Sequence, residues 1–188
     1  ITVEYGDLSI TKKAVTITVD DASKVYGDND PAFADASLSG GVGEELKDII
    51  LTVDRSNEDE EVGTYNDVLN ISKTEADLEG EYPNYDFEVK PGDFSILQNA
   101  NSIKITSADG SWVYDGEVHT KPEYTVTYGT TVAELKEGTT NVFVLPTGDE
   151  LEITETAAGV KNVSDSAENN NTFSYVLENA ENYNGSIT

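Results

Sequence analysis

Apolar and polar residues alternate along much of the chain with a period of two, the pattern of strands that bury one face. Five segments show it: 15–19, 85–90, 103–105, 124–128 and 173–177. In the first, Val15, Ile17 and Val19 share one face while the threonines between them share the other. The pattern predicts antiparallel sheets, each with one face toward solvent.

Helical periodicity is nearly absent, and the only candidates are 44–50 and 131–136, each a turn or two long. Turn-forming pairs such as Gly40-Gly41 and Asp109-Gly110 separate the apolar segments. The chain is therefore expected to be all-β. About seven short strands per module favour tandem antiparallel β-sandwich modules of the immunoglobulin-like kind. The alternative is a β-grasp-like module with 44–50 as its helix.

Three short motifs occur in the same order in both halves, which indicates two related modules. The pairs are 25–28 with 113–116, 43–46 with 148–151, and 84–87 with 182–185. Tyr26 and Tyr114 both stand at turns, and each is expected to cap a small core while its hydroxyl reaches a loop carbonyl.

A closing motif marks the module edges. Gly92-Asp93-Phe94-Ser95-Ile96 ends the first module, and Gly6-Asp7-Leu8-Ser9-Ile10 has the same form. The predicted division is 1–10 as the closing strand of a preceding repeat, 11–98 as the first module, 99–101 as linker, and 102–188 as a divergent second module without its last strand. An open sheet edge accepts an added strand, so residues 1–10 are expected to exchange with another molecule.

The amino-acid composition limits the kinds of molecule that the chain can bind. The net charge is -26, with 37 acidic against 11 basic residues, so no basic patch exists to neutralise nucleic acid or an anionic membrane. The chain contains no cysteine, which excludes disulfides and thiol ligands. No apolar run is long enough for a membrane helix, so direct membrane insertion is not expected.

The first half combines the leading strand 10–19, the stretch 23–33 with Val25-Tyr26-Gly27-Asp28, and the later Val62-Gly63-Thr64-Tyr65. This combination, which covers roughly 10–98, resembles the MBG repeats of bacterial surface proteins. The second half, with Trp112-Val113-Tyr114, looks like a divergent repeat of the same proteins. The resemblance implies tandem placement in large secreted or cell-wall proteins, without enzymatic activity or cofactor.

Few residues offer chemistry. His119 is the only histidine, and without a second histidine or a cysteine it does not predict a metal site or a general base. Asp28 and Asp30, in a turn-rich acidic stretch, are the candidate calcium ligands. Trp112, the only tryptophan, begins a predicted strand and is expected to lie in the core or at its rim. It is also the candidate ligand-binding residue, because exposed indole rings stack on sugars.

These observations predict a non-catalytic structural or adhesive repeat segment at the bacterial cell surface or cell wall, acting as a stalk or as a weak multivalent adhesion module. Its expected partners are neighbouring repeats of the same chain and a host glycan or protein. A glycan-binding module of mucin type and a calcium-stiffened spacer are the alternatives.

Overall fold

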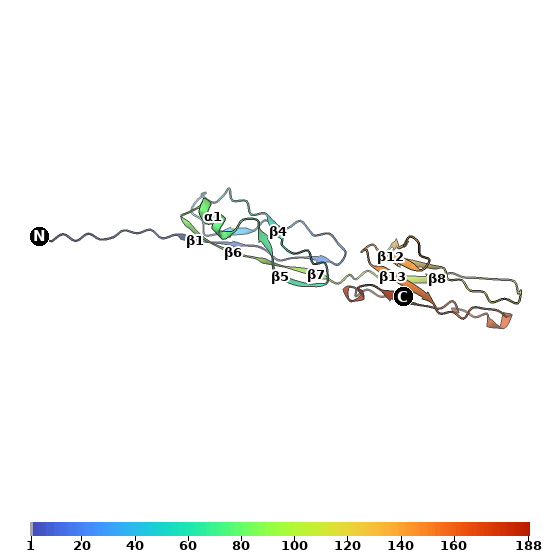
Figure 1. The fold of residues 1–188 in the computed structure, drawn as a ribbon. Coiled ribbons are helices and arrows are strands. Elements are labelled where there is room, and N and C mark those ends of the chain that lie inside the picture. Colours follow the sequence, from blue (N-terminus) through green and yellow to red (C-terminus); the bar gives the residue numbers. More distant parts are fainter. Residues whose placement is uncertain (1) are drawn as a thin grey trace. The chain divides into compact units, whose positions relative to one another are not determined.

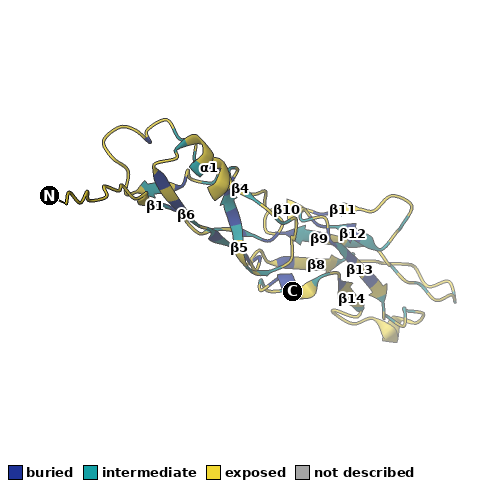
Figure 2. Cartoon of the chain, turned by 60° about the vertical axis from the view of Figure 1, so that its left-hand side comes forward, coloured by how far each residue is buried: buried dark blue, intermediate teal, exposed yellow. Residues whose placement is uncertain are grey.

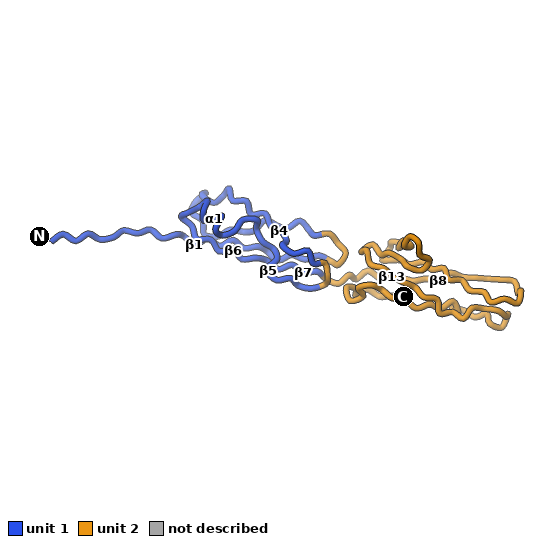
Figure 3. The backbone as a smooth tube through the Cα atoms, viewed as in Figure 1, with its two compact units in different colours: residues 1–24, 30–59, 63–96 blue, residues 25–29, 60–62, 97–188 orange. Residues whose placement is uncertain are grey.

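The computed structural model describes residues 2–188, so Ile1 of the predicted strand 1–10 lies outside the described residues. Strands dominate the fold, and the all-β prediction is confirmed (Figure 1). The chain separates into two compact units (Figure 3). Unit 1 comprises 1–24, 30–59 and 63–96, and unit 2 comprises 25–29, 60–62 and 97–188. The predicted module limits stay a prediction, because these units are not continuous in sequence.

Unit 1 contains two sheets. The first has the order β3-β1-β6 and consists of β1 (Lys13–Thr18), β3 (Ser37–Ser39) and β6 (Tyr85–Lys90). The second has the order β2-β7-β5-β4 and consists of β2 (Ala22–Val25), β4 (Val53–Arg55), β5 (Gly63–Ile71) and β7 (Gly92–Leu97). Ile17, Leu69 and Phe94 are fully buried, and they mark the apolar interior of the unit.

One strand pair departs from the predicted antiparallel arrangement. β1 pairs with β6 in parallel, with Val15 opposite Phe87. Parallel neighbours need a long crossover connection, and the chain between β1 and β6 is long enough to supply one. That connection ends in helix α1 (Glu75–Glu81), which packs on β6. The strand pattern shows which residues are buried but not which strands pair, so this direction was not visible in the sequence.

Neither candidate helix forms in the described residues. The stretch 44–49 forms successive hydrogen-bonded turns, and 131–136 forms the short strands β10 (Thr131–Val132) and β11 (Glu134–Leu135). The helix that exists is α1, which begins with a capping box in which Thr74 and Asp77 bond each other's backbone N–H. It buries only Leu78, so it has no apolar stripe to detect. In the described part of the chain, no helix is long and apolar enough to cross a bilayer.

Unit 2 also contains two sheets. One has the order β10-β9-β8, with β8 (Ile103–Ser107) and β9 (Tyr124–Tyr128) beside β10. The other has the order β11-β12-β13-β14, with β12 (Val142–Val144), β13 (Glu150–Glu155) and β14 (Phe173–Leu177) beside β11. Two 3₁₀ turns complete the unit, η1 (Val163–Asp165) and η2 (Ala180–Asn182).

The buried faces follow the predicted alternation in most strands (Figure 2). Val15, Ile17 and Val19 are buried in unit 1, and Ile103 and Ile105 are buried in unit 2.

In 173–177 the predicted alternation is wrong for Tyr175, which is 42% exposed. β14 lies at the edge of its sheet, where there is less packing to cover a side chain.

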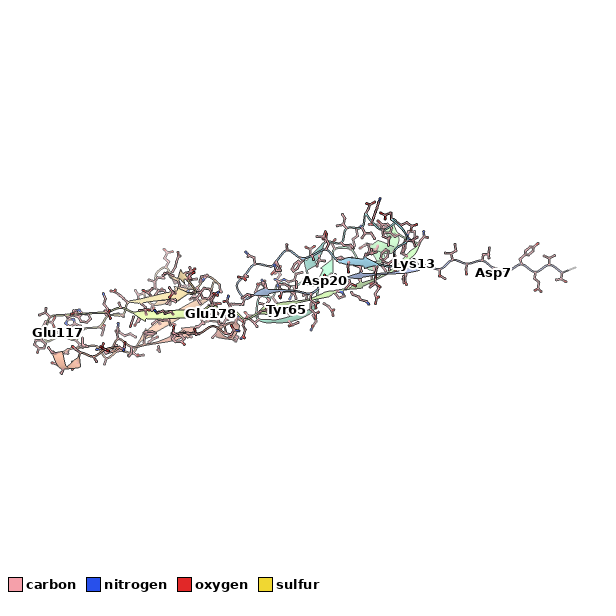
Figure 4. The ribbon with its side chains drawn as sticks, turned by 180° about the vertical axis from the view of Figure 1, so that it is seen from behind. Asp7, Lys13, Asp20, Tyr65, Glu117 and Glu178 are labelled. Atoms are coloured by element: carbon pink, nitrogen blue, oxygen red, sulfur yellow. The ribbon has the colours of Figure 1, made fainter. Side chains whose placement is uncertain are left out.

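The segment 2–10 forms no strand, and Leu8 and Ile10 are fully exposed. Figure 4 shows Asp7 on this extended segment, beyond Lys13 at the start of β1. The same motif at 92–96 lies in β7, where Phe94 and Ile96 are buried. The motif therefore forms a strand where a sheet is present to receive it.

The burial of Leu78 can be tested with a matched pair of leucine variants. Leu78→Ala should lower the free energy of unfolding of unit 1 by about 3 kcal/mol, because it leaves a cavity beneath α1. Leu8→Ala, at a fully exposed position in the same unit, should leave it unchanged. Urea unfolding followed by circular dichroism measures both. Equal stability of the two variants would contradict the packing of α1.

Candidate functional site

A buried carboxylate organises the polar interior of unit 2. Asp149 is only 5% exposed, and its Oδ1 accepts hydrogen bonds from the Tyr26 hydroxyl at 3.0 Å and from Asn179 Nδ2 at 2.8 Å. Its Oδ2 accepts from the Tyr183 hydroxyl and from Thr147 Oγ1, the latter at 3.2 Å. Neutral donors thus satisfy both oxygens, as a buried carboxylate without a cation requires. These five residues are called the Asp149 cluster below.

The turn 25–29 is built to deliver Tyr26 into this cluster. Gly27 has a φ of +86°, which side chains other than glycine rarely adopt, and a Cβ there would lie 2.5 Å from Thr147 Cγ2. The main chain is held as well, since Tyr26 N–H donates to Leu97 O and Asn99 Nδ2 donates to Tyr26 O, both at 2.8 Å. Tyr26 therefore donates a hydrogen bond to Asp149, and Gly27 allows the turn to pack closely against Thr147 of the same cluster.

A second segment, 60–62, enters unit 2 through Asn182. This side chain is 1% exposed, donates from Nδ2 to Glu61 Oε2 at 2.7 Å, and accepts from Val62 N–H at 3.2 Å. Asn182 lies in η2, directly before Tyr183 of the Asp149 cluster. Unit 2 is therefore completed by two short stretches that precede its main sequence by dozens of residues.

The structure changes the expected role of the two repeated tyrosines. Tyr26 is buried as predicted, but its hydroxyl binds the Asp149 carboxylate rather than a loop carbonyl. Tyr114 is 66% exposed, so its predicted capping of a core was wrong. Its motif carries the glycine one residue later, at Gly116, and the turn there presents the ring to solvent. Sequence reasoning placed Asp149 in the repeated motif 148–151 but missed its role, since nothing local shows which donors reach its carboxylate.

Trp112 lies partly exposed beside a cavity of unit 2. Its ring stacks on the His119 imidazole, with centroids 5.0 Å apart and planes 10° from parallel. His119 Nε2 lies 3.0 Å from Asp115 Oδ1. The cavity that Trp112 and His119 line contains no Asp or Glu. In the part of the chain that the structure describes, His119 therefore lies beside Asp115 but not in a cavity lined by several acids.

The calcium candidates Asp28 and Asp30 belong to different units. Asp30 accepts from Lys24 Nζ at 2.8 Å and pairs with Arg55 Nε at 3.0 Å. Both cations have nearly buried side chains, and the Arg55 guanidinium also lies 4.8 Å from the centre of the Phe94 ring. Two cations on one carboxylate oppose the binding of a third.

Within residues 2–188, no group of three or more His, Asp or Glu side chains is arranged to hold a metal. Calcium at this turn stays an untested prediction.

Burial raises the pKa of three tyrosines of unit 2. Burial, together with the hydrogen bond to the Asp149 carboxylate, raises the pKa of Tyr183 far above its ordinary 10.0. Burial also raises the pKa of Tyr26 and of Tyr128. The neutral phenol is the form that the fold stabilises, because a phenolate would face the carboxylate inside an apolar environment.

An alkaline titration should reveal the tyrosines whose pKa is raised by burial in unit 2. The folded pKa of Tyr183 is raised, so its stabilising contribution is complete below the ordinary value of 10.0 and is lost as the pH rises above it. We expect tyrosinate absorbance to appear in two steps, the later one together with loss of the circular dichroism signal. Ionisation of all ten tyrosines in one step near pH 10.0, with the fold intact, would contradict this account.

Comparison with known proteins adds one match. Residues 15–95 match the family model of the MBG domain, YGX type, and Tyr26-Gly27-Asp28 fits those letters. No curated protein and no solved structure matches the chain. MBG repeats are structural modules that occur in surface proteins. The stretch from 15 to 95 of this chain is therefore an MBG-type repeat.

Proposed function

We propose that the chain is a non-catalytic structural segment of a bacterial surface protein, in which it acts as a load-bearing spacer. One observation carries this proposal: the YGX turn of the MBG-type repeat lies in unit 2, fastened to the buried Asp149 carboxylate. The polypeptide that builds the repeat thus supplies part of the interior of unit 2. Tension on the polypeptide at Tyr26 would therefore load the hydrogen bonds of the Asp149 cluster inside unit 2.

The acidic surface supports the same role. With a net charge of -26, copies of the chain repel one another and stay solvated. This suits a segment that must present other regions without collapsing onto its neighbours. The scarcity of basic side chains also gives nucleic acid nothing to bind.

The proposal can be tested by pulling on the intact chain in a single-molecule force experiment. Asp149→Ala removes the acceptor of two buried tyrosine hydroxyls and of the half-buried Thr147 and Asn179 side chains. We therefore expect it to lower both the unfolding force and the stability of unit 2, the latter by about 3 kcal/mol. Tyr26→Phe keeps the ring and removes one donor, with an expected cost of about 1 kcal/mol.

The matched control is Lys136→Ala, which breaks the exposed pair with Glu150 in the same unit. It should leave the unfolding force unchanged, because exposed ion pairs contribute little. If Asp149→Ala and Lys136→Ala unfold at the same force, the Asp149 cluster bears no load.

We further propose that the segment 2–10 adds as a strand to a sheet edge of a neighbouring molecule. Its Gly-Asp-Leu-Ser-Ile motif has the form of β7, and its apolar side chains are exposed where those of β7 are buried. Strand addition would cover Leu8 and Ile10 and satisfy their backbone groups.

Sedimentation of the full chain tests strand addition. The chain should associate reversibly, and Leu8→Asp with Ile10→Asp should shift it to monomer without changing its melting. Indistinguishable sedimentation of the two proteins would exclude strand addition by this segment, whatever the result of the pulling experiment.

A further inference from the structure

Two long connections in unit 2 are joined to each other by hydrogen bonds. They are 108–123, between β8 and β9, and 156–172, between β13 and β14. His119 N–H donates to Val160 O at 2.9 Å, and Val160 N–H donates to His119 O at 3.0 Å. Asn171 Nδ2 adds hydrogen bonds to Ala108 O and Lys121 O, both at 2.9 Å. Connections of this length that are held in place are usually functional rather than mere links between strands.

Glycines shape the space between these connections. Gly159 has a φ of +77°, and a Cβ there would lie 2.8 Å from His119 O. A Cβ on Gly110 would collide with the six-membered ring of the Trp112 indole. Both positions therefore need glycine for the stacked Trp112 and His119 rings to lie as they do. Figure 4 shows Glu117, between these rings in sequence, at the far end of unit 2 from Glu178.

The resulting cavity is small and lacks acidic side chains. Its volume is about 140 Å³. Its polar and aromatic lining includes Trp112, His119, Lys121, Ser166, Asn170 and Asn171. No carboxylate lines it, although the chain carries 37 acidic residues. The two basic side chains already have acidic partners outside the lining, since His119 bonds Asp115 and Lys121 pairs with Glu123 at 2.6 Å.

The lining of the cavity indicates which kind of ligand would fit it. An indole ring that is 41% exposed offers a flat apolar surface, and amide and hydroxyl groups beside it offer hydrogen bonds. A sugar ring presents an apolar C–H face, which can lie on the indole ring, and a rim of hydroxyls, which can bond the amide and hydroxyl groups beside it. An acidic sugar would meet a lysine that already pairs with Glu123 and a chain of net charge -26.

We propose that this cavity binds one neutral hexose residue of a glycan, with the sugar ring against Trp112. The site is independent of the spacer role, because it lies in the two joined connections and uses no residue of the Asp149 cluster. A single sugar in so small a cavity binds weakly, with a dissociation constant on the order of a millimolar. Useful adhesion then comes from many copies on one surface.

The chain contains one tryptophan, so its fluorescence reports on this site alone. Titration of the full chain with methyl galactoside, methyl glucoside and methyl N-acetylgalactosaminide should give a saturable change in emission with at least one of them. Ala167→Leu fills the cavity but keeps the reporter, and it should abolish the change. Absence of a saturable change with all three sugars would overturn the proposal.

A glycan array probed with the chain on a multivalent support provides the second measurement. Trp112→Ala should weaken array binding at least about tenfold, the equivalent of 1.4 kcal/mol. Tyr175→Ala is the matched control, because that ring is equally exposed in the same unit but lies away from the cavity. Equal losses in the two variants, or binding only to acidic sugars, would each overturn the assignment. Circular dichroism should confirm that both variants are folded.

Discussion

A carboxylate buried without a cation is the constraint on which unit 2 depends. Removing an ionised carboxylate from water costs several kcal/mol unless hydrogen bonds replace those of water. Asp149 obtains its donors from the neighbouring Thr147 and from three distant residues, Tyr26, Asn179 and Tyr183. All of them must be in place together. The turn 25–29 is therefore a structural part of unit 2 rather than a loop that rests on it.

The two units satisfy their buried polar groups in different ways. In unit 1, Asp30 meets two cations, Lys24 and Arg55, which have little exposure of their own. In unit 2, neutral hydroxyl and amide groups surround Asp149. A chain with only 11 basic residues has few cations for its interior, so hydroxyls and amides take their place. These buried interactions are screened by salt much less than the surface charges are.

Strands and connections have separate roles in unit 2. The sheets bury Val126 and Leu151 and hold the ends of the long connections in place. Trp112 was identified in the sequence because indole chemistry is recognisable in a single residue. Its stacking on His119 and the hydrogen bonds from Asn171 were not, because contacts such as Asn171 with Ala108, 63 residues apart, leave no trace in the local pattern. The absence of acids from the cavity likewise becomes visible only once the lining is assembled.

By itself, the sequence determined the all-β class, the buried faces of β1, β6 and β8, and the MBG-type repeat with its tyrosine and glycine. These follow from local properties, since alternation is a property of neighbouring residues and a turn needs its glycine wherever it occurs. Only the tertiary structure decided three further features. β1 and β6 run parallel, α1 packs through its buried Leu78, and the Tyr26 hydroxyl reaches the Asp149 carboxylate. Each of these depends on which distant segments meet. That choice is made by the total burial and hydrogen bonding of the folded chain, not by any stretch of it read alone.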